Sequence, residues 1–249
     1  MAIFMYVLLL CMLNIPAYAA KLSITPTSIV LHPQQRTAAL NFTNLANKPV
    51  TLQIFFKSWK QSEGGKMQLR NSREVIVFPR ILKIAPGRER PIRIGFRGRW
   101  PRVERGFRIF ADELPDINIK SGTGVIFPVR LSIPLFVRNQ AAAVPVNISI
   151  IRAFLENGQI RLTIRNNATQ HVAINKIQAQ IYDQRGRLLK QQTDAGGRVL
   201  AKSQVFFDLA VPTNVCRQVR SVKIELTAQR SKLQKRFNLN PRGCSKRSG

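Results

Sequence analysis

The chain has few acidic residues, few histidines and few cysteines. Its 249 residues include 12 Asp and Glu and 2 His, against 40 Lys and Arg, which gives a formal net charge of +28. The two histidines, His32 and His171, have no catalytic serine, cysteine or aspartate motif beside them, and no HExxH spacing occurs. We therefore expect a protein that is not an enzyme and that has no metal site.

The chain also lacks an apolar run long enough to cross a bilayer as a helix, which takes about 20 residues. The apolar run Ala2–Leu13 is shorter and is followed by the small-residue pattern Ala17-Tyr18-Ala19. This arrangement is typical of a secretory signal, although no Lys or Arg precedes the run. We predict a cleaved signal peptide over residues 1–19 and no membrane insertion.

A helical hydrophobic period is missing as well. Apolar and polar residues alternate along most of the chain, as they do in half-buried strands, and turn residues separate the alternating segments. The strands predicted in the first half are Leu22–Leu31, Thr37–Thr43, Val50–Trp59, Val75–Ile84, Pro91–Phe96, Gly106–Glu113 and Val125–Val137. We predict an all-β chain of two immunoglobulin-like β-sandwiches, residues 20–138 and 146–249, joined by a linker over 139–145.

Of the three cysteines, Cys11 lies in the predicted signal, which leaves Cys216 and Cys244. In an oxidising compartment two such cysteines normally form a disulfide. A hairpin centred near Arg230 would place the two residues opposite each other, within the distance that a disulfide can bridge. We predict this bond, since two thiols are too few for a zinc site.

The excess of basic residues attracts anionic partners such as nucleic acid, anionic lipid or acidic protein. The charge is spread along the chain, so it does not choose among them. The loop Gly98–Arg105 carries Arg99, Arg102 and Arg105 around Trp100 and is the best contact candidate. A secreted basic module that binds an anionic polymer or a membrane surface through this loop is the alternative function.

The most unusual segment is Gly122–Arg138. Every odd-numbered residue from Val125 to Val137 is apolar, yet the segment contains Pro128 and Pro134. Proline belongs on the edge of a sheet, and an apolar edge is an aggregation hazard unless it has a use. One use is strand addition to a partner, and the other reading is a strand whose apolar face fills its own core.

At this point the sequence resembles the periplasmic pilus-assembly chaperones of the chaperone–usher pathway. The matching segments are LSITPTSIVL (Leu22–Leu31), LNFTN (Leu40–Asn44), VIVFPRILKIAPG (Val75–Gly87), IRIGFR (Ile92–Arg97), FADELP (Phe110–Pro115) and GTGVIFPVRLSIPLFV (Gly122–Val137). The resemblance covers nearly all of the first half and is looser in the second. It is strongest to the branch that serves archaic, spore-coat-type fimbriae.

The resemblance implies a boomerang of two sandwiches that binds fimbrial subunits in the periplasm and delivers them to an outer-membrane usher. Binding would be donor-strand complementation, in which one strand of the chaperone completes a subunit that lacks its own last strand. The donor residues would be Val125, Phe127 and Val129, with Leu131 beside them, each contributing about 1.5–3 kcal/mol if it fills a pocket. The resemblance implies no cofactor, no ATP and no nucleic-acid partner, and it leaves self-association through the donor strand open.

Two positions depart from the pattern of the best-known branch. That branch holds the C-terminal carboxylate of the subunit with two basic residues, and the matching positions here are Ser28 and Pro134. Arg130 and Arg93 are the remaining candidates for a charge-assisted bond to a carboxylate. The resemblance also implies an ion pair between Arg93 and Glu113 near the junction of the two domains.

Overall fold

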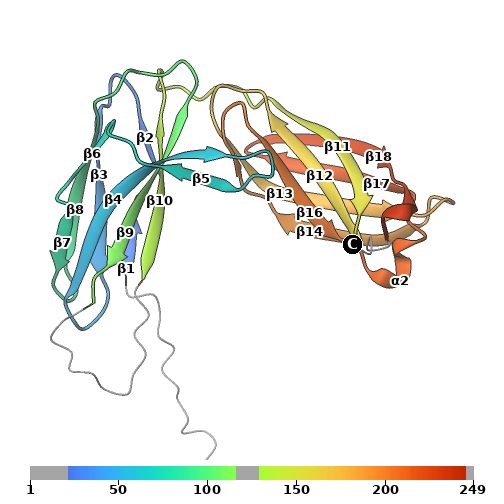
Figure 1. The fold of residues 1–249 in the computed structure, drawn as a ribbon, viewed down its shortest axis with the longest axis horizontal. Helices are drawn as coiled ribbons and strands as arrows, with labels where there is room; N and C mark the ends of the chain where they lie inside the picture. Colours follow the sequence, from blue (N-terminus) through green and yellow to red (C-terminus); the bar gives the residue numbers. More distant parts are fainter. Residues whose placement is uncertain (1–21, 116–128, 245–249) are drawn as a thin grey trace, which may run out of the picture.

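The computed structural model describes residues 22–115 and 129–244. Nearly all of its regular structure is strand, and the helices among the described residues are the single turn α2 (Thr213–Cys216) and the 3-10 turn η1 (Pro241–Cys244). Two pairs of sheets form two sandwiches (Figure 1). The predicted all-β fold class is confirmed.

The first domain contains β1 to β10. One sheet has the order β1-β3-β8-β6, and the other has the order β2-β10-β9-β4-β5, with β7 also paired to β4. The bounds are β1 Leu22–Thr25, β2 Ile29–Leu31, β3 Thr37–Asn44, β4 Val50–Gln61, β5 Met67–Arg70, β6 Val75–Phe78, β7 Ile81–Ile84, β8 Glu89–Phe96, β9 Arg105–Glu113 and β10 Arg130–Val137.

The second domain contains β11 to β18. Its sheets have the orders β11-β12-β16 and β14-β13-β17-β18, with β15 paired to β13. The bounds are β11 Ile148–Glu156, β12 Gln159–Asn166, β13 Val172–Tyr182, β14 Leu188–Ala195, β15 Arg198–Val199, β16 Gln204–Ala210, β17 Ser221–Ala228 and β18 Ser231–Asn238.

The alternating residues of each domain meet in a separate apolar core. In the first domain Leu52, Phe107 and Ile109 are fully buried between the two sheets, and in the second Ile164 and Ile181 are. Each strand contributes every second side chain, as its pleat requires. Burial of these side chains is the main favourable term in the stability of either sandwich.

Two segments that the sequence predicts as single strands are divided between sheets. Leu22–Leu31 forms β1 in the four-stranded sheet and β2 in the facing sheet, and Val75–Ile84 forms β6 and β7 in the same manner. Pro26 and Pro79 lie at the two crossings, where a missing backbone N–H breaks no ladder. The alternation of apolar and polar residues does not reveal where the chain crosses between sheets, because both sheets face one core.

The disulfide between Cys216 and Cys244 is confirmed, with a Cα–Cα distance of 5.8 Å. The predicted setting is wrong, since the two residues do not lie opposite each other in the β17–β18 hairpin. Cys216 ends α2 and Cys244 ends η1, and both turns lie beyond the paired residues of that hairpin. The bond therefore ties the last turn of the described chain to the second core.

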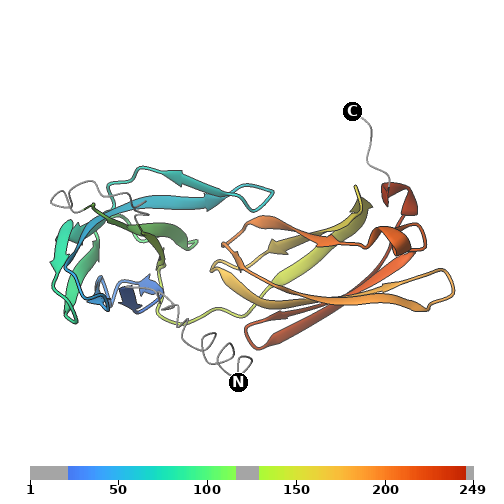
Figure 2. The same cartoon turned by 90° about the horizontal axis from the view of Figure 1, so that it is seen from below.

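The two domains meet through the β4–β5 hairpin and one end of β10. Figures 1 and 2 show the hairpin reaching from the first domain to the second. The side-chain amide of Gln61 donates to Arg198 O at 2.7 Å and accepts from Leu200 N at 2.8 Å. Trp59, Phe136 and Leu200 form a small buried cluster beside these bonds. The junction is thus both polar and apolar.

Candidate functional site

Strand β10 is paired along its whole length on one side only. It runs antiparallel to β9 from Arg130 to Val137, but its parallel partner β2 meets only Leu135–Val137. In the part of the chain that the structure describes, no strand lies beside Arg130–Pro134 on that second side. This stretch is therefore an open sheet edge.

The backbone pattern explains why a proline sits in this strand. Glu113 N donates to Val129 O at 2.9 Å, so the backbone groups of the odd-numbered residues of β10 bond to β9. Arg138 N donates to Leu31 O at 3.0 Å, so the backbone groups of the even-numbered residues point to the opposite side of the strand. The N–H and C=O groups of Ser132 therefore point outward from the sheet. Pro134 belongs to the same outward set, where its missing N–H removes no bond to β9.

The apolar face of β10 begins in the core and ends outside it. Ile133, Leu135 and Val137 are buried, and Leu131 is partly buried against the same core. Val129, next in the alternation, is 42% exposed. The predicted donor residues Val125 and Phe127 lie outside the described residues.

The opposite face of the six-stranded sheet turns away from the core, and we call it the inner face. Its residues form rows across the strands, because opposite residues of paired strands share a face. One row is Pro134, Arg108 and Lys57, and the next is Ser132, Phe110 and Phe55. The rings of Phe55 and Phe110 stack with centroids 5.1 Å apart.

Arg108, on the inner face, has a guanidinium that is only partly satisfied. Its guanidinium lies over the Trp59 ring at 4.0 Å, and one terminal nitrogen reaches Ser132 O at 3.5 Å. Its Nε is buried and has no hydrogen-bond partner among the described residues. Burial, and then the nearby charge of Arg198 in the second domain, lower the pKa of Arg108. An anion beside this guanidinium would relieve both effects.

The predicted anchor Arg130 already has a carboxylate partner. Its guanidinium forms a two-point ion pair with Asp112, at 2.7 and 2.6 Å. The hydrogen bonds to Asp112 raise the pKa of Arg130. The other predicted anchor, Arg93, is exposed on β8 in the four-stranded sheet, away from the inner face.

The structure does not bring Arg93 and Glu113 together. They lie in the two facing sheets, and no ion pair joins them within the described residues. Glu113 ends β9, whereas the second domain packs near its start, where a Cβ on Gly106 would lie 3.6 Å from Leu200. The ion pair expected at the junction is thus absent from the described part of the chain.

Glu104 occupies the junction instead, and the sequence reasoning missed it. Its Oε1 accepts from His171 N at 2.8 Å and lies 2.7 Å from His171 Nδ1. One feature of the sequence could have pointed to it: Glu104 is the one acidic residue in the basic loop Gly98–Arg105. His171 is likewise mostly buried, with 18% of its side chain exposed.

The basic loop of the alternative function is largely engaged within the fold. Arg105 pairs with Glu74, and Trp100 packs on Phe96 with ring centroids 5.0 Å apart. Arg102 lines a cavity at the junction and is exposed, and Arg99 is exposed without lining that cavity. The loop therefore supports the fold through Arg105 and Trp100, and its exposed basic residues are Arg99 and Arg102.

Within residues 22–115 and 129–244 no group of three or more His, Cys, Asp and Glu residues could hold a metal ion. The same residues include no helix with the length and apolar character of a membrane span.

Fold and edge together define a class: two-sandwich β-proteins in which the last strand of the first sandwich is open for pairing. Residues 21–142 match the family described as the pili and flagellar-assembly chaperone, PapD N-terminal domain. The first domain of this chain belongs to that family, and the chain is a homologue of pilus-assembly chaperones.

Solved structures share the fold over nearly the whole chain. One is the complex of the chaperone CsuC with the tip adhesion subunit CsuE, from archaic chaperone–usher Csu pili of Acinetobacter baumannii. It is 22% identical, with 88% of this chain and 98% of that chain covered and a TM-score of 0.62. The complex of the SafB chaperone with SafA pilin of Salmonella enterica is 12% identical, with 89% of this chain and 98% of that chain covered and a TM-score of 0.57. The CupB2 chaperone of Pseudomonas aeruginosa is 18% identical, with 87% of this chain and 98% of that chain covered and a TM-score of 0.53. No curated protein sequence matches the chain.

Proposed function

We propose that this chain is a periplasmic chaperone that stabilises fimbrial subunits by donor-strand complementation and passes them to an outer-membrane usher. The observation that carries the proposal is the course of the apolar face of β10. This face is buried from Ile133 to Val137 and leaves the core at Leu131 and Val129, beside an open edge. Such an edge suits a partner that lacks a strand.

The chemistry of binding would divide between backbone and side chains. The outward N–H and C=O groups of Ser132 and Arg130 would continue a ladder into the subunit, and Pro134 would end it. Val129, together with Val125 and Phe127, would fill pockets that the missing strand leaves open. The solved chaperones CsuC and SafB, each seen with a pilus subunit, lend support through their fold.

We further propose Arg108 as the anchor of the subunit's terminal carboxylate, in place of Arg130 and Arg93. Arg108 lies next to Pro134 across the ladder, so a chain added at that edge would end close to it. Lys57 is opposite Arg108 on the next strand, and Arg198 is near, so the surrounding field favours an anion. The buried, unpartnered Nε of Arg108 could donate to that carboxylate.

The usher would need a surface that the subunit leaves free. Ile76, Phe78 and Ile81 are 48%, 71% and 53% exposed, close together in sequence on β6 and β7. β6 is the edge of the four-stranded sheet, whereas β10 lies in the other sheet. We propose this apolar group as the docking surface for the usher.

The localisation rests on two observations. The predicted signal, residues 1–19, lies outside the described residues. The disulfide between Cys216 and Cys244 favours an oxidising compartment, which agrees with the periplasm.

The decisive experiment is co-expression with candidate subunits, chosen as short β-rich secreted proteins. We expect a one-to-one periplasmic complex with the wild type and none with Val129→Asp, because a buried unpaired carboxylate costs several kcal/mol. Ile151→Asp is the matched control, since Ile151 in the second domain is 38% exposed. Equal recovery of subunits with Val129→Asp and the wild type would contradict the donor-strand proposal.

A further inference from the structure

The contact between Glu104 and His171 joins the two domains at the strands of the proposed binding site. Glu104 directly precedes β9, and its own N–H donates to Thr169 O in the second domain at 2.8 Å. The His171 ring stacks on Phe136 of β10, with centroids 3.7 Å apart and planes 12° from parallel. One imidazole thus touches β10 and the residue that precedes β9.

The carboxylate of Glu104 is deeply buried and only half satisfied. One percent of its side chain is exposed, and Oε2 has no hydrogen-bond partner among the described residues. Oε1 accepts from the backbone N–H and lies against Nδ1 of His171. A buried carboxylate in this condition gains most from a cation held against it.

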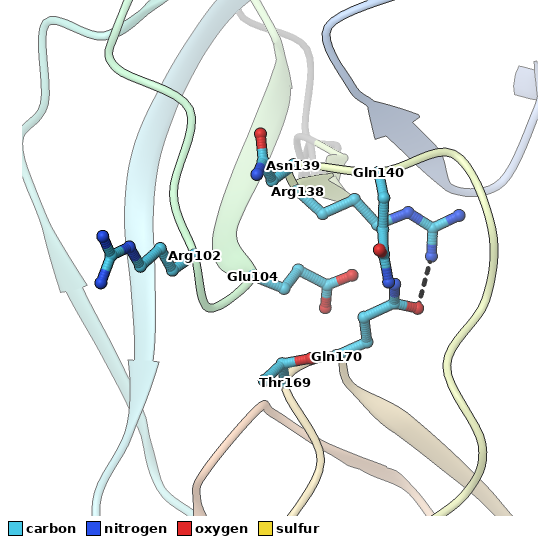
Figure 3. Close-up of a pocket in the computed structure, with 7 residues that line it drawn as sticks. All are labelled: Arg102, Glu104, Arg138, Asn139, Gln140, Thr169 and Gln170. Atoms are coloured by element: carbon cyan, nitrogen blue, oxygen red, sulfur yellow. Dashed lines mark hydrogen bonds between the residues drawn. The ribbon is translucent and has the colours of Figure 1, made fainter.

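The other cations around this carboxylate do not pair with it. Glu104, Arg102 and Arg138 are the charged residues that line a cavity of about 200 Å³ at the junction, with Thr169 and Gln170 among its uncharged walls. Arg138 bonds to Gln170 Oε1 at 2.7 Å and to Ala141 O. In Figure 3 the Arg102 guanidinium points away from the Glu104 carboxylate. No Lys or Arg of the described chain pairs with Glu104, so His171 is the residue that can supply the charge.

We propose that His171 is a proton-dependent latch between the two domains. Histidine side chains change charge between about pH 5 and 8. When His171 is protonated, the Nδ1–H to Glu104 bond becomes a charge-assisted bond inside a nearly dry junction, and the positive ring lies on Phe136. When it is neutral, the same carboxylate keeps only uncharged donors. The latch is therefore closed at low pH and opens as the pH rises.

The latch acts on the free chain and goes beyond the proposed function. A closed latch holds the second domain, and with it Arg198, against the inner face of the first. An open latch leaves the Gln61 bonds and the Trp59–Phe136–Leu200 cluster to hold the junction. The ratio of open to closed junctions therefore depends on one proton.

The test measures the distance between the domains in the full chain, by two fluorescent labels on exposed positions of β8 and β18, from pH 5 to pH 8. The wild type is expected to shift toward open junctions at pH 8, by roughly tenfold in the ratio of open to closed molecules. His171→Gln is expected to be open at both pH values. His32→Gln removes the other histidine and should behave as the wild type.

Glu104→Gln is the second variant, since it keeps the shape and the acceptor but removes the charge. It should abolish the pH dependence even if His171→Gln folds poorly, and circular dichroism reports folding for each variant. A wild-type distance that does not change with pH, or a His171→Gln chain that keeps the full change, overturns the latch. The outcome is independent of subunit binding, which Val129→Asp tests.

Discussion

The last strands of the two domains make opposite use of a sheet edge. β10 in the first domain reads RLSIPLFV, and β18 in the second reads SKLQKRFN. Each is paired in full on one side and open, over all or part of its length, on the other. Lys232, Lys235 and Arg236 blunt the edge of β18, as charged side chains do in many sheets, whereas β10 has its one basic residue, Arg130, at its start.

The difference shows that an open edge alone does not make a binding site. A charged edge resists pairing with another strand because its side chains would lose water on contact. For an edge with apolar side chains, the removal of those side chains from water is favourable, so pairing with another strand is stabilised. The second domain is closed further by the disulfide at Cys244, and the first domain has no cysteine among its described residues.

Arg108→Gln in the first domain should have the largest effect on subunit binding, and the corresponding change in the second domain should have little. Losing one partner of a desolvated charge pair costs about 2–5 kcal/mol, so the subunit complex should weaken by that amount. Arg161→Gln is the matched control in the second domain. Arg161 lies on a strand too, but it pairs with its neighbour Asp208 in an exposed ion pair that contributes about 0–1 kcal/mol.

The measurement is a titration of purified chain with a subunit peptide that ends in a free carboxylate, repeated with the amidated peptide. The wild type should prefer the free carboxylate, and the Arg108→Gln chain should bind the two peptides alike. A preference that survives in Arg108→Gln would return the anchor to Arg130 or Arg93.

Removal of the disulfide should affect the second domain alone. The double substitution Cys216→Ala and Cys244→Ala frees a loop of 28 residues in sequence, worth about 3–4 kcal/mol of unfolding free energy. Calorimetry should show a lower transition for the second domain while that of the first stays in place. A common shift of both transitions would mean that the domains unfold as one unit.

Phe78→Asp should give the smallest change in stability and a specific change in assembly. Phe78 is 71% exposed, so the free energy of unfolding should change by no more than about 0.5 kcal/mol. Recovery of the subunit complex should match the wild type, while fibres on the cell surface are lost. Normal fibres from a Phe78→Asp chain would mean that the usher docks elsewhere.

The sequence predicts the fold well where the argument depends on alternation. Period-two patterns locate the strands of the first domain except β5, and counting cysteines finds the bond between Cys216 and Cys244. Alternation fails where the chain crosses between sheets, as at Pro26, because both sheets place the same face against one core. It also says nothing about which strands become neighbours.

The candidate site divides in the same way. The apolar face of β10 is visible in the printed sequence, and Val129 lies where that face leaves the core. The role of Arg108 is not visible, because its neighbours Pro134 and Lys57 come from distant segments. The expected pair of Arg93 and Glu113 fails for a related reason: a resemblance carries residues over by position, and these two positions end in facing sheets.

The sequence by itself determined the all-β class, the two sandwiches and the apolar alternation along β10, because side-chain alternation and covalent order are local properties. Only the tertiary structure decided which cation lies unpaired on the inner face and that Glu104 and His171 meet at the junction. Both depend on register and on the approach of the two domains, and the free energy of a buried charge is set by everything packed around it.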